Sequence, residues 1–168
     1  MNAAAAKTDT RIRMAQLADI PAILALFAGE VAAGLMLPRN EAEMQARIGY
    51  WRVAEVNGEV IGCVSLVFFS QTLCEIRSLA VAKDYRQNGV GKKLVQAAVE
   101  FAQESGVRQV LTLTRSPWVF EPLGFERNLI ENFPAKVQQD CQLCPFIENC
   151  DEVALLHTFQ ESDLNNGK

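Results

Sequence analysis

A glycine-containing loop near the middle of the chain has the clearest chemical signature. The residues Arg86-Gln87-Asn88-Gly89-Val90-Gly91 stand between a predicted strand and a predicted amphipathic helix. Glycines allow a ligand to approach the backbone closely, and the N–H groups at the start of a helix bind anions. The pattern Arg86-x-x-Gly89-x-Gly91 therefore indicates a phosphate-binding loop. For these six residues alone, a tight turn with a helix cap is an equal alternative.

Two other phosphate-binding motifs do not match the loop. A Walker A motif continues from Gly-Lys to serine or threonine, whereas Gly91 is followed by Lys92 and Lys93. A dinucleotide-binding fingerprint that starts at Gly89 needs a third glycine where Leu94 stands. Neither a P-loop nucleotidase nor a Rossmann enzyme is indicated.

Three of the five cysteines, Cys141, Cys144 and Cys150, are clustered near the C-terminus. The first pair has a spacing that can chelate zinc or an iron–sulfur cluster, but a tetrahedral site needs a fourth ligand. The candidates for it are Asp140, Asp151 and His157. Because one Cys-x-x-Cys pair with a single further cysteine is a weak metal signature, we predict free thiols and no bound metal.

The remaining cysteines and the only histidine are predicted to be packing residues. Cys63 and Cys74 fall in predicted strands and are interpreted as small core hydrophobes. His157 also falls in a predicted strand, where a packed side chain is commoner than a ligand or a base.

The segment before the loop predicts the elements that position it. Polar and apolar residues alternate over residues 11–14, which predicts a strand. Asp19 and Pro21 supply a cap and a first-turn proline for the helix that follows. A second helix is predicted over residues 41–48. Asn57-Gly58 suits a two-residue hairpin turn between strands at 51–56 and 59–69. A third strand is predicted from Leu73 to Val81.

The segment after the loop predicts a helix up to Ser105-Gly106, a strand over 110–114 and a short helix over 117–123. Residues 131–168 are interpreted as an irregular, cysteine-containing segment with a closing strand at 152–159. This order predicts an α/β (α+β) fold in which helices flank a mixed, mainly antiparallel central sheet.

Composition narrows the class of protein. The 168 residues fit one domain over 1–168, with a disordered tail at 1–9. A net charge of -4 argues against a nucleic-acid partner. No stretch is long enough to span a membrane, and the N-terminus lacks the apolar core of a signal peptide. We therefore expect a cytoplasmic protein.

The context of the loop resembles the GNAT superfamily of N-acetyltransferases, which use acetyl-coenzyme A. The resemblance runs from Arg11 to Phe125 and rests on the segment 76–86, the loop itself and Leu123-Gly124-Phe125. It implies a GNAT-like sheet, pantetheine paired with the backbone of residues 79–81, and pyrophosphate on the loop amides. The implied cofactor-binding residues are Leu79, Ala80, Val81, Arg86, Gln87, Asn88, Gly89, Val90, Gly91 and Lys92.

A narrower likeness concerns the acetyl acceptor. Residues 34–39 and 113–116 resemble the glutamate-binding segments of N-acetylglutamate synthases, the amino-acid N-acetyltransferases of arginine biosynthesis. The likeness implies that Arg39 and Arg115 hold the substrate's carboxylates, for which a guanidinium fork is well suited. Arg77 and Ser78 are further candidates for substrate binding. Taken singly, each arginine would be interpreted as a solvated surface residue, and it is the presence of two arginines in two matching segments that favours substrate binding.

The proton transfers have two candidate residues. A carboxylate that reaches the acceptor amine directly or through water can act as its general base, and Glu75 is that candidate. Alternatively, Glu75 is a solvent-facing strand residue or a partner of Arg77. Many GNAT enzymes protonate the departing thiolate with a tyrosine four residues before the Gly-Phe pair, but Phe120 stands here, which leaves Ser116 or water.

We therefore expect an acetyl-coenzyme A-dependent amino-acid N-acetyltransferase that acts on a small molecule, L-glutamate, by direct transfer. One alternative is a GNAT enzyme for another amino acid, a polyamine or a protein amine. The other is a catalytically silent module that binds coenzyme A or senses metal. The sequence leaves open whether the protein is a monomer or a homodimer.

Overall fold

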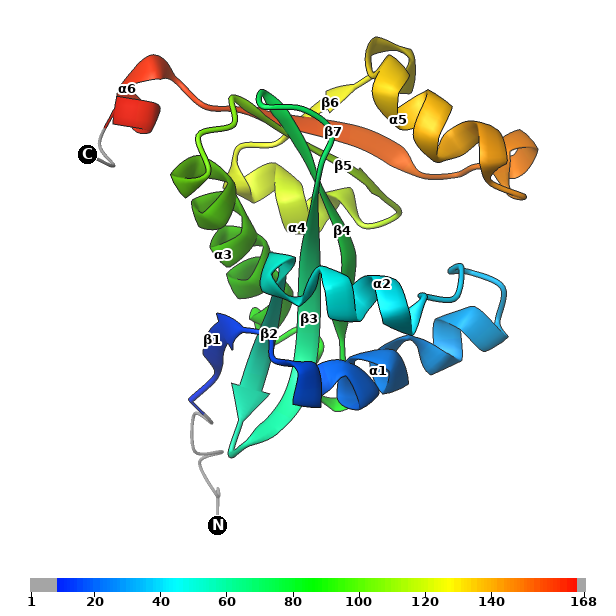
Figure 1. Cartoon of the computed structure of the whole chain (residues 1–168), viewed down its shortest axis with the longest axis vertical. Coiled ribbons are helices and arrows are strands. Elements are labelled where there is room, and N and C mark those ends of the chain that lie inside the picture. The colour runs from blue at the N-terminus through cyan, green and yellow to red at the C-terminus, as the bar shows by residue number, and fades with distance from the viewer. Residues whose placement is uncertain (1–8, 166–168) are drawn as a thin grey trace. The chain divides into compact units, whose positions relative to one another are not determined.

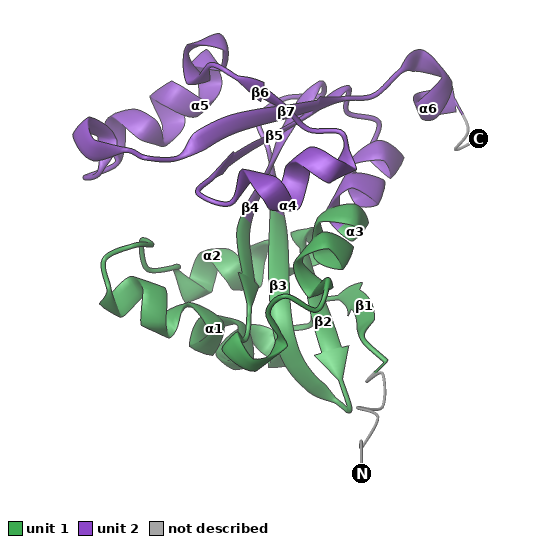
Figure 2. Cartoon of the chain, turned by 180° about the vertical axis from the view of Figure 1, so that it is seen from behind, with its two compact units in different colours: residues 1–65, 78–97 green, residues 66–77, 98–168 purple. Residues whose placement is uncertain are grey.

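A computed structural model describes residues 9–165 of the chain (Figure 1). The chain divides into two compact units, the first of residues 1–65 and 78–97 and the second of residues 66–77 and 98–168 (Figure 2). The tail predicted over residues 1–9 lies outside the described part except for Asp9.

The first unit begins with strand β1 (Arg11–Met14) and helix α1 (Ile20–Ala32), as predicted. Pro21 lies in the first turn of α1, where its missing N–H is not needed. The side chain of Asp19 does not cap α1 as expected, because a cap residue needs a non-helical backbone and Asp19 has φ -81° and ψ -15°. Its carboxylate pairs with Arg13 at 2.7 Å instead.

A glycine turn ends α1 and directs the chain toward Arg39. Gly34 has a φ of 71°, its N–H donates to Val31 O at 3.1 Å, and the N–H of Leu35 donates to Glu30 O at 2.9 Å. These two bonds satisfy carbonyl groups that the end of a helix leaves exposed. Helix α2 (Glu41–Ala46) follows and is shorter than predicted, because a 3-10 turn replaces its last part.

Strands β2 (Trp51–Val56) and β3 (Glu59–Phe68) form the predicted hairpin. Asn57 and Gly58 have φ values of 51° and 82°, the left-handed pair that this two-residue turn requires. Strand β4 (Leu73–Val81) has the predicted bounds, and helix α3 (Val90–Glu104) ends just before the predicted stop at Ser105-Gly106. Helix α3 begins at Val90, within the glycine loop.

The two faces of the hairpin contact different helices. Val53 and Cys63 pair across the strands and belong to the core cluster that α1 and α2 cover. The next pair, Ala54 and Gly62, points to the opposite face because side chains alternate along a strand. There a Cβ on Gly62 would lie 3.0 Å from Leu94 of α3, so the glycine permits the close approach of that helix.

The second unit contains the three predicted elements β5 (Gln109–Thr114), α4 (Pro117–Phe120) and β7 (Val153–Thr158). Three further elements were not predicted: β6 (Glu126–Asn128), α5 (Pro134–Gln139) and α6 (Glu161–Asn165). Each spans six residues or fewer, which is too short for a hydrophobic period to stand out. The segment interpreted as irregular is therefore partly helical.

Within residues 9–165, seven strands form one sheet in the order β1-β2-β3-β4-β5-β7-β6. Strands β4 and β5 are parallel, whereas β1–β2, β2–β3, β5–β7 and β6–β7 are antiparallel pairs. These pairings, with helices along the sheet, confirm the predicted mixed, mainly antiparallel α/β (α+β) fold.

Each unit has a buried apolar cluster of its own. One contains Ile23, Phe27 and Trp51, and the other is built around Leu111 and Phe133. Cys63 and Cys74 are 0 % exposed, which confirms them as core residues. Burial raises the pKa of both thiols, that of Cys74 to about 12. No helix of the described residues has both the length and the apolar character needed to cross a lipid bilayer.

Candidate active site

The glycine loop opens helix α3 with a backbone suited to an anion. Gln87 and Gly89 have φ values of 65° and 80°, so the chain passes through left-handed conformations before the helix begins at Val90. Lys93 N donates to Gly89 O at 3.1 Å. The N–H groups of residues 90–92 come before this first hydrogen bond of the helix, so they have no partner inside the helix. Together with the positive end of the dipole of a 15-residue helix, these amides fit a pyrophosphate.

Arg86, predicted to bind the cofactor, joins the loop to its surroundings. Its Nε donates to Val81 O at 2.9 Å, and its Nη2 pairs with Glu30 Oε1 at 3.1 Å. A hollow of about 460 Å³ lies beside these contacts and is lined by α1, the end of β4 and Arg86. Arg86 therefore fixes the shape of the loop, and its contact with the cofactor stays a prediction.

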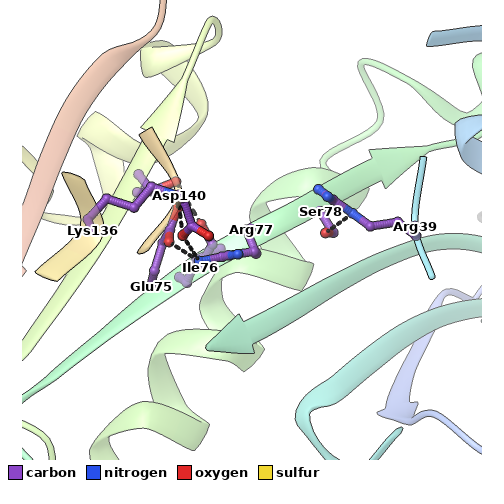
Figure 3. Close-up of polar contacts among 8 residues, drawn as sticks. Arg39, Glu75, Ile76, Arg77, Ser78, Lys136 and Asp140 are labelled. Carbon is purple, nitrogen blue, oxygen red and sulfur yellow. Dashed lines mark hydrogen bonds and ion pairs between the residues drawn. The ribbon is translucent and has the colours of Figure 1, made fainter. Parts of the chain in front are cut away.

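Ser78 has a strained backbone in β4. Its φ of 58° is a left-handed value that few residues other than glycine adopt. The side-chain hydroxyl accepts a hydrogen bond from Arg39 Nε at 3.0 Å (Figure 3). The Ser78 carbonyl accepts one from the Cys63 thiol at 3.5 Å. Arg39 and Ser78, both predicted to bind substrate, are therefore in direct contact.

Glu75 is buried rather than solvent-facing, with a side chain that is 2 % exposed. Its Oε2 lies 2.6 Å from Arg77 Nη2, and its Oε1 lies 2.9 Å from Lys136 Nζ. Asp140 Oδ2 lies 2.8 Å from Arg77 Nη2 and 3.1 Å from Lys136 Nζ (Figure 3). We call Glu75, Arg77, Lys136 and Asp140 the charge ring. Glu75 is thus a partner of Arg77, and its role as general base remains a prediction.

The charge ring favours the ionised forms of Arg77 and Asp140. Burial by itself would lower the pKa of the Arg77 guanidinium, but Glu75 and Asp140 outweigh this effect and raise it. Burial by itself would raise the pKa of Asp140, but Arg77 and Lys136 hold that pKa below its usual value. Two cations and two carboxylates give the ring no net charge, which is the condition under which charged groups tolerate burial.

Arg115 lies just after β5 and contacts two carboxylates. Its Nε is 2.6 Å from Asp151 Oδ1, and its Nη1 is 3.7 Å from Glu152 Oε1. The Arg115 and Asp151 side chains are 39 % and 68 % exposed, so water screens this pair. Burial raises the pKa of Glu152, and nearby cations only partly offset it. Ser116 follows, with its N–H bonded to Thr114 Oγ1 at 2.9 Å.

The end of α4 offers no proton donor. Phe120 is 2 % exposed and its ring packs edge-on against Phe125, with centroids 5.4 Å apart. His157 packs against the same Phe125 ring at 5.3 Å and lies 3.3 Å from the Gly124 carbonyl through Nδ1. His157 is therefore a packing residue, as predicted. Ser116 or water remains the predicted donor to the departing thiolate.

The clustered cysteines do not form a recognisable metal site. Cys141 and Cys144 are partly buried and Cys150 is exposed. Burial raises the pKa of the Cys141 thiol, which disfavours the thiolate that binds metal. In the part of the chain that the structure describes, no group of three or more Cys, His, Asp or Glu side chains is placed to hold a metal ion.

Protein purified without chelators is expected to contain no stoichiometric metal, because the cysteine segment offers no complete ligand set. Elemental analysis by plasma mass spectrometry measures this directly. The matched control is the double variant Cys141→Ser/Cys144→Ser, prepared in the same way. One zinc ion per chain in the parent and none in the variant would show that the segment is a metal site.

The family model described as "Acetyltransferase (GNAT) family" matches residues 21–125 of the chain. The chain belongs to the GNAT family of acetyltransferases. An uncharacterized N-acetyltransferase of Chlorobaculum tepidum is 39% identical to this GNAT protein over 150 residues, which cover 89% of this chain and 97% of that protein.

Two other relatives are longer than this GNAT chain. The amino-acid acetyltransferase of Pasteurella multocida is 28% identical over 130 residues, and the match covers 76% of this chain but 30% of that protein. The N-acetylglutamate synthase of Neisseria gonorrhoeae, solved with coenzyme A and N-acetyl-glutamate, matches with a TM-score of 0.79 at 23% identity, over 93% of this chain and 36% of that chain. This last likeness shows a shared fold.

Membership of the GNAT family confirms the predicted enzyme class. The protein is an N-acetyltransferase, and the acetyl donor of this class is acetyl-coenzyme A. The loop that the sequence singles out lies within the matched residues, and its contact with the pyrophosphate stays a prediction.

Sequence reasoning missed Lys136 altogether and considered Asp140 and Asp151 only as metal ligands. The available signal was local: Pro134 marks a helix start, and Asp140 stands four residues after Lys136, at the end of that helix. Their contact with β4 had no sequence signal, because Arg77 and Asp140 are 63 positions apart.

Proposed function

We propose that this GNAT enzyme transfers an acetyl group from acetyl-coenzyme A to the α-amine of L-glutamate. The observation that carries the proposal is the environment of Arg115, whose guanidinium already pairs with the carboxylates of Asp151 and Glu152. Because Arg115 and Asp151 are exposed, a substrate carboxylate can displace the Asp151 carboxylate at little cost. Arg39 supplies the second guanidinium, fixed through its bond to Ser78.

Two comparisons support this acceptor. The Pasteurella multocida relative is an amino-acid acetyltransferase, and the Neisseria gonorrhoeae synthase that shares the fold was solved with N-acetyl-glutamate. By extension, the proposal places the enzyme in arginine biosynthesis and in the cytoplasm. A single domain over residues 1–168 and a homodimer also stay proposals.

The cosubstrate is assigned to backbone and loop groups. The carbonyl and N–H groups of Leu79, Ala80 and Val81 pair with the pantetheine arm, and the amides of residues 87–92 hold the pyrophosphate. The loop part of this assignment uses main-chain groups because the first N–H groups of a helix have no partner inside it. The strand part follows the resemblance to the GNAT family.

Direct transfer requires two proton movements. The neutral amine attacks the thioester carbon, the new C–N bond forms, the C–S bond breaks, and the sulfur leaves as a thiolate. Glu75 takes the proton of the amine through a water molecule, since its side chain is 2 % exposed and gives a substrate little surface to touch. Ser116 or water returns a proton to the thiolate.

A second candidate function keeps the acetyltransferase chemistry but replaces the acceptor with a cationic amine. It is favoured by the net charge of -4, which attracts cations. A catalytically silent module that binds coenzyme A is the third candidate, favoured by the buried Phe120 at the position of the usual tyrosine.

Thiol release with a panel of acceptors separates these candidates. We expect the highest kcat/KM with L-glutamate, lower values with L-glutamine, which lacks the second charge, and lower values with L-aspartate, whose carboxylates are closer together. Lysine and spermidine represent cationic acceptors. Faster turnover of a cationic amine would replace glutamate with the second candidate, and release with no acceptor above background would favour the silent module.

A further inference from the structure

Lys136 is a buried lysine in helix α5, and this helix is not part of the sequence motifs described above. Lys136 is 8 % exposed, whereas lysines are seldom so buried unless a partner balances the charge. Its Nζ contacts Asp140, the residue that follows α5, at 3.1 Å and Glu75 on β4 at 2.9 Å. Lys136 therefore links α5 directly to the residue proposed as general base.

The contacts give each oxygen of Glu75 its own cation. Lys136 lies at Oε1 and Arg77 at Oε2, as Figure 3 shows. A carboxylate that has an ion pair at each oxygen cannot rotate about its last bond without lengthening at least one of the two pairs. With Arg77 alone, one oxygen would be held and the carboxylate plane would be free to turn. Lys136 is thus the group that fixes this plane.

The charge ring has a buried side and a more exposed side. The side chains of Glu75 and Lys136 are 2 % and 11 % exposed, whereas those of Arg77 and Asp140 are 24 % and 36 % exposed. A substrate or a water molecule can therefore reach Arg77 or Asp140 more easily than Lys136. Any effect of Lys136 on the reaction must pass through Glu75 or Asp140.

We propose that Lys136 is a positioning residue that holds the Glu75 carboxylate in the orientation from which it accepts the proton of the acceptor amine. This inference rests on the proposed function, in which Glu75 is the base. Asp140 has a supporting part, because its Oδ2 also pairs with the Lys136 ammonium and its charge keeps the ring neutral. Helix α5, which is not part of the sequence motifs described above, then sets the orientation of the Glu75 carboxylate in the proton transfer.

The test is a double-mutant cycle on kcat with Lys136→Met, Glu75→Gln and the combined variant. Methionine is unbranched like lysine, has one side-chain atom fewer and carries no charge. Lys136→Met should lower kcat about tenfold and leave the KM for acetyl-coenzyme A unchanged, in line with a positioning effect on general-base catalysis. In the Glu75→Gln background the same substitution should have no further effect, because Lys136 acts through Glu75. Lys136→Arg should restore most of the activity.

The controls separate positioning from folding and from the proposed function. Gln138→Met changes an exposed residue of the same helix and should keep the parental kcat. If Lys136→Met does not fold, as judged by circular dichroism and thermal melting, Asp140→Asn replaces it in the cycle, because asparagine keeps the shape of the side chain. The cycle uses whichever acceptor gives the fastest turnover, so an error about glutamate does not affect it. Glu75→Gln with parental kcat would overturn the base role and the inference together. Effects of Lys136→Met and Glu75→Gln that multiply would overturn the inference alone.

Discussion

Gly91→Asp is expected to abolish the binding of acetyl-coenzyme A, with a loss of at least about a hundredfold in affinity, which is about 2.7 kcal/mol. Gly91 lies in the first turn of α3, among the amides assigned to the pyrophosphate. An aspartate there places a side chain and a negative charge where the anion binds, and it competes for the same N–H groups. Isothermal titration calorimetry with acetyl-coenzyme A measures the change.

Two variants control for other effects of this substitution. Gly91→Ala adds a methyl group without charge and should keep most of the affinity, because the backbone of Gly91 is not left-handed. Gly49→Asp adds the same charge at an exposed glycine with open space around its Cα and should bind normally. Equal binding by the parent and Gly91→Asp would show that the pyrophosphate lies elsewhere.

Arg39→Ala and Arg115→Ala are each expected to lower kcat/KM for L-glutamate by about ten- to a hundredfold. A hydrogen bond to a charged group contributes about 1.5–3 kcal/mol, and each arginine is assigned one substrate carboxylate. Affinity for acetyl-coenzyme A should change little. Lysine at either position keeps the charge but loses the planar fork, so its activity should be intermediate. Steady-state kinetics with glutamate, glutamine and aspartate test this.

Arg127→Ala is the matched control for the arginine variants. Arg127 is also ion-paired, with Glu121 at 2.9 Å, and its side chain is 63 % exposed. It has no assigned role, so its removal should leave the kinetics at the parental level. Parental kinetics for both Arg39→Ala and Arg115→Ala would remove glutamate as the acceptor and leave the acetyltransferase class intact.

Several features follow from residues that are close together in the sequence. Asn57-Gly58 determines the hairpin turn because its two residues tolerate positive φ, and both have it. Pro21 marks the start of α1 in the same way. The glycine loop is recognisable because strand, loop and helix follow one another directly, so its anion-binding geometry depends on a single short segment.

The substrate side of the site depended on the tertiary structure. Glu75 was predicted as a base, but its burial and its pairing with Lys136 come from the packing of α5 against β4. The left-handed backbone of Ser78 could not be predicted from the sequence, because serine does not favour that conformation and the surrounding structure imposes it. Likewise, residues 113–116 indicated Arg115 as a substrate-binding candidate, but nothing in the sequence indicated its contact with Asp151.

The sequence by itself therefore determined the order of the main elements, the enzyme class and the position of the glycine loop between β4 and α3, all of which rest on local patterns. Only the tertiary structure decided which charges neutralise one another around Glu75 and Arg115. The physical reason is that a local pattern acts over a few residues, whereas an ion pair such as Arg77–Asp140 joins positions 63 apart and forms only when packing brings two elements together.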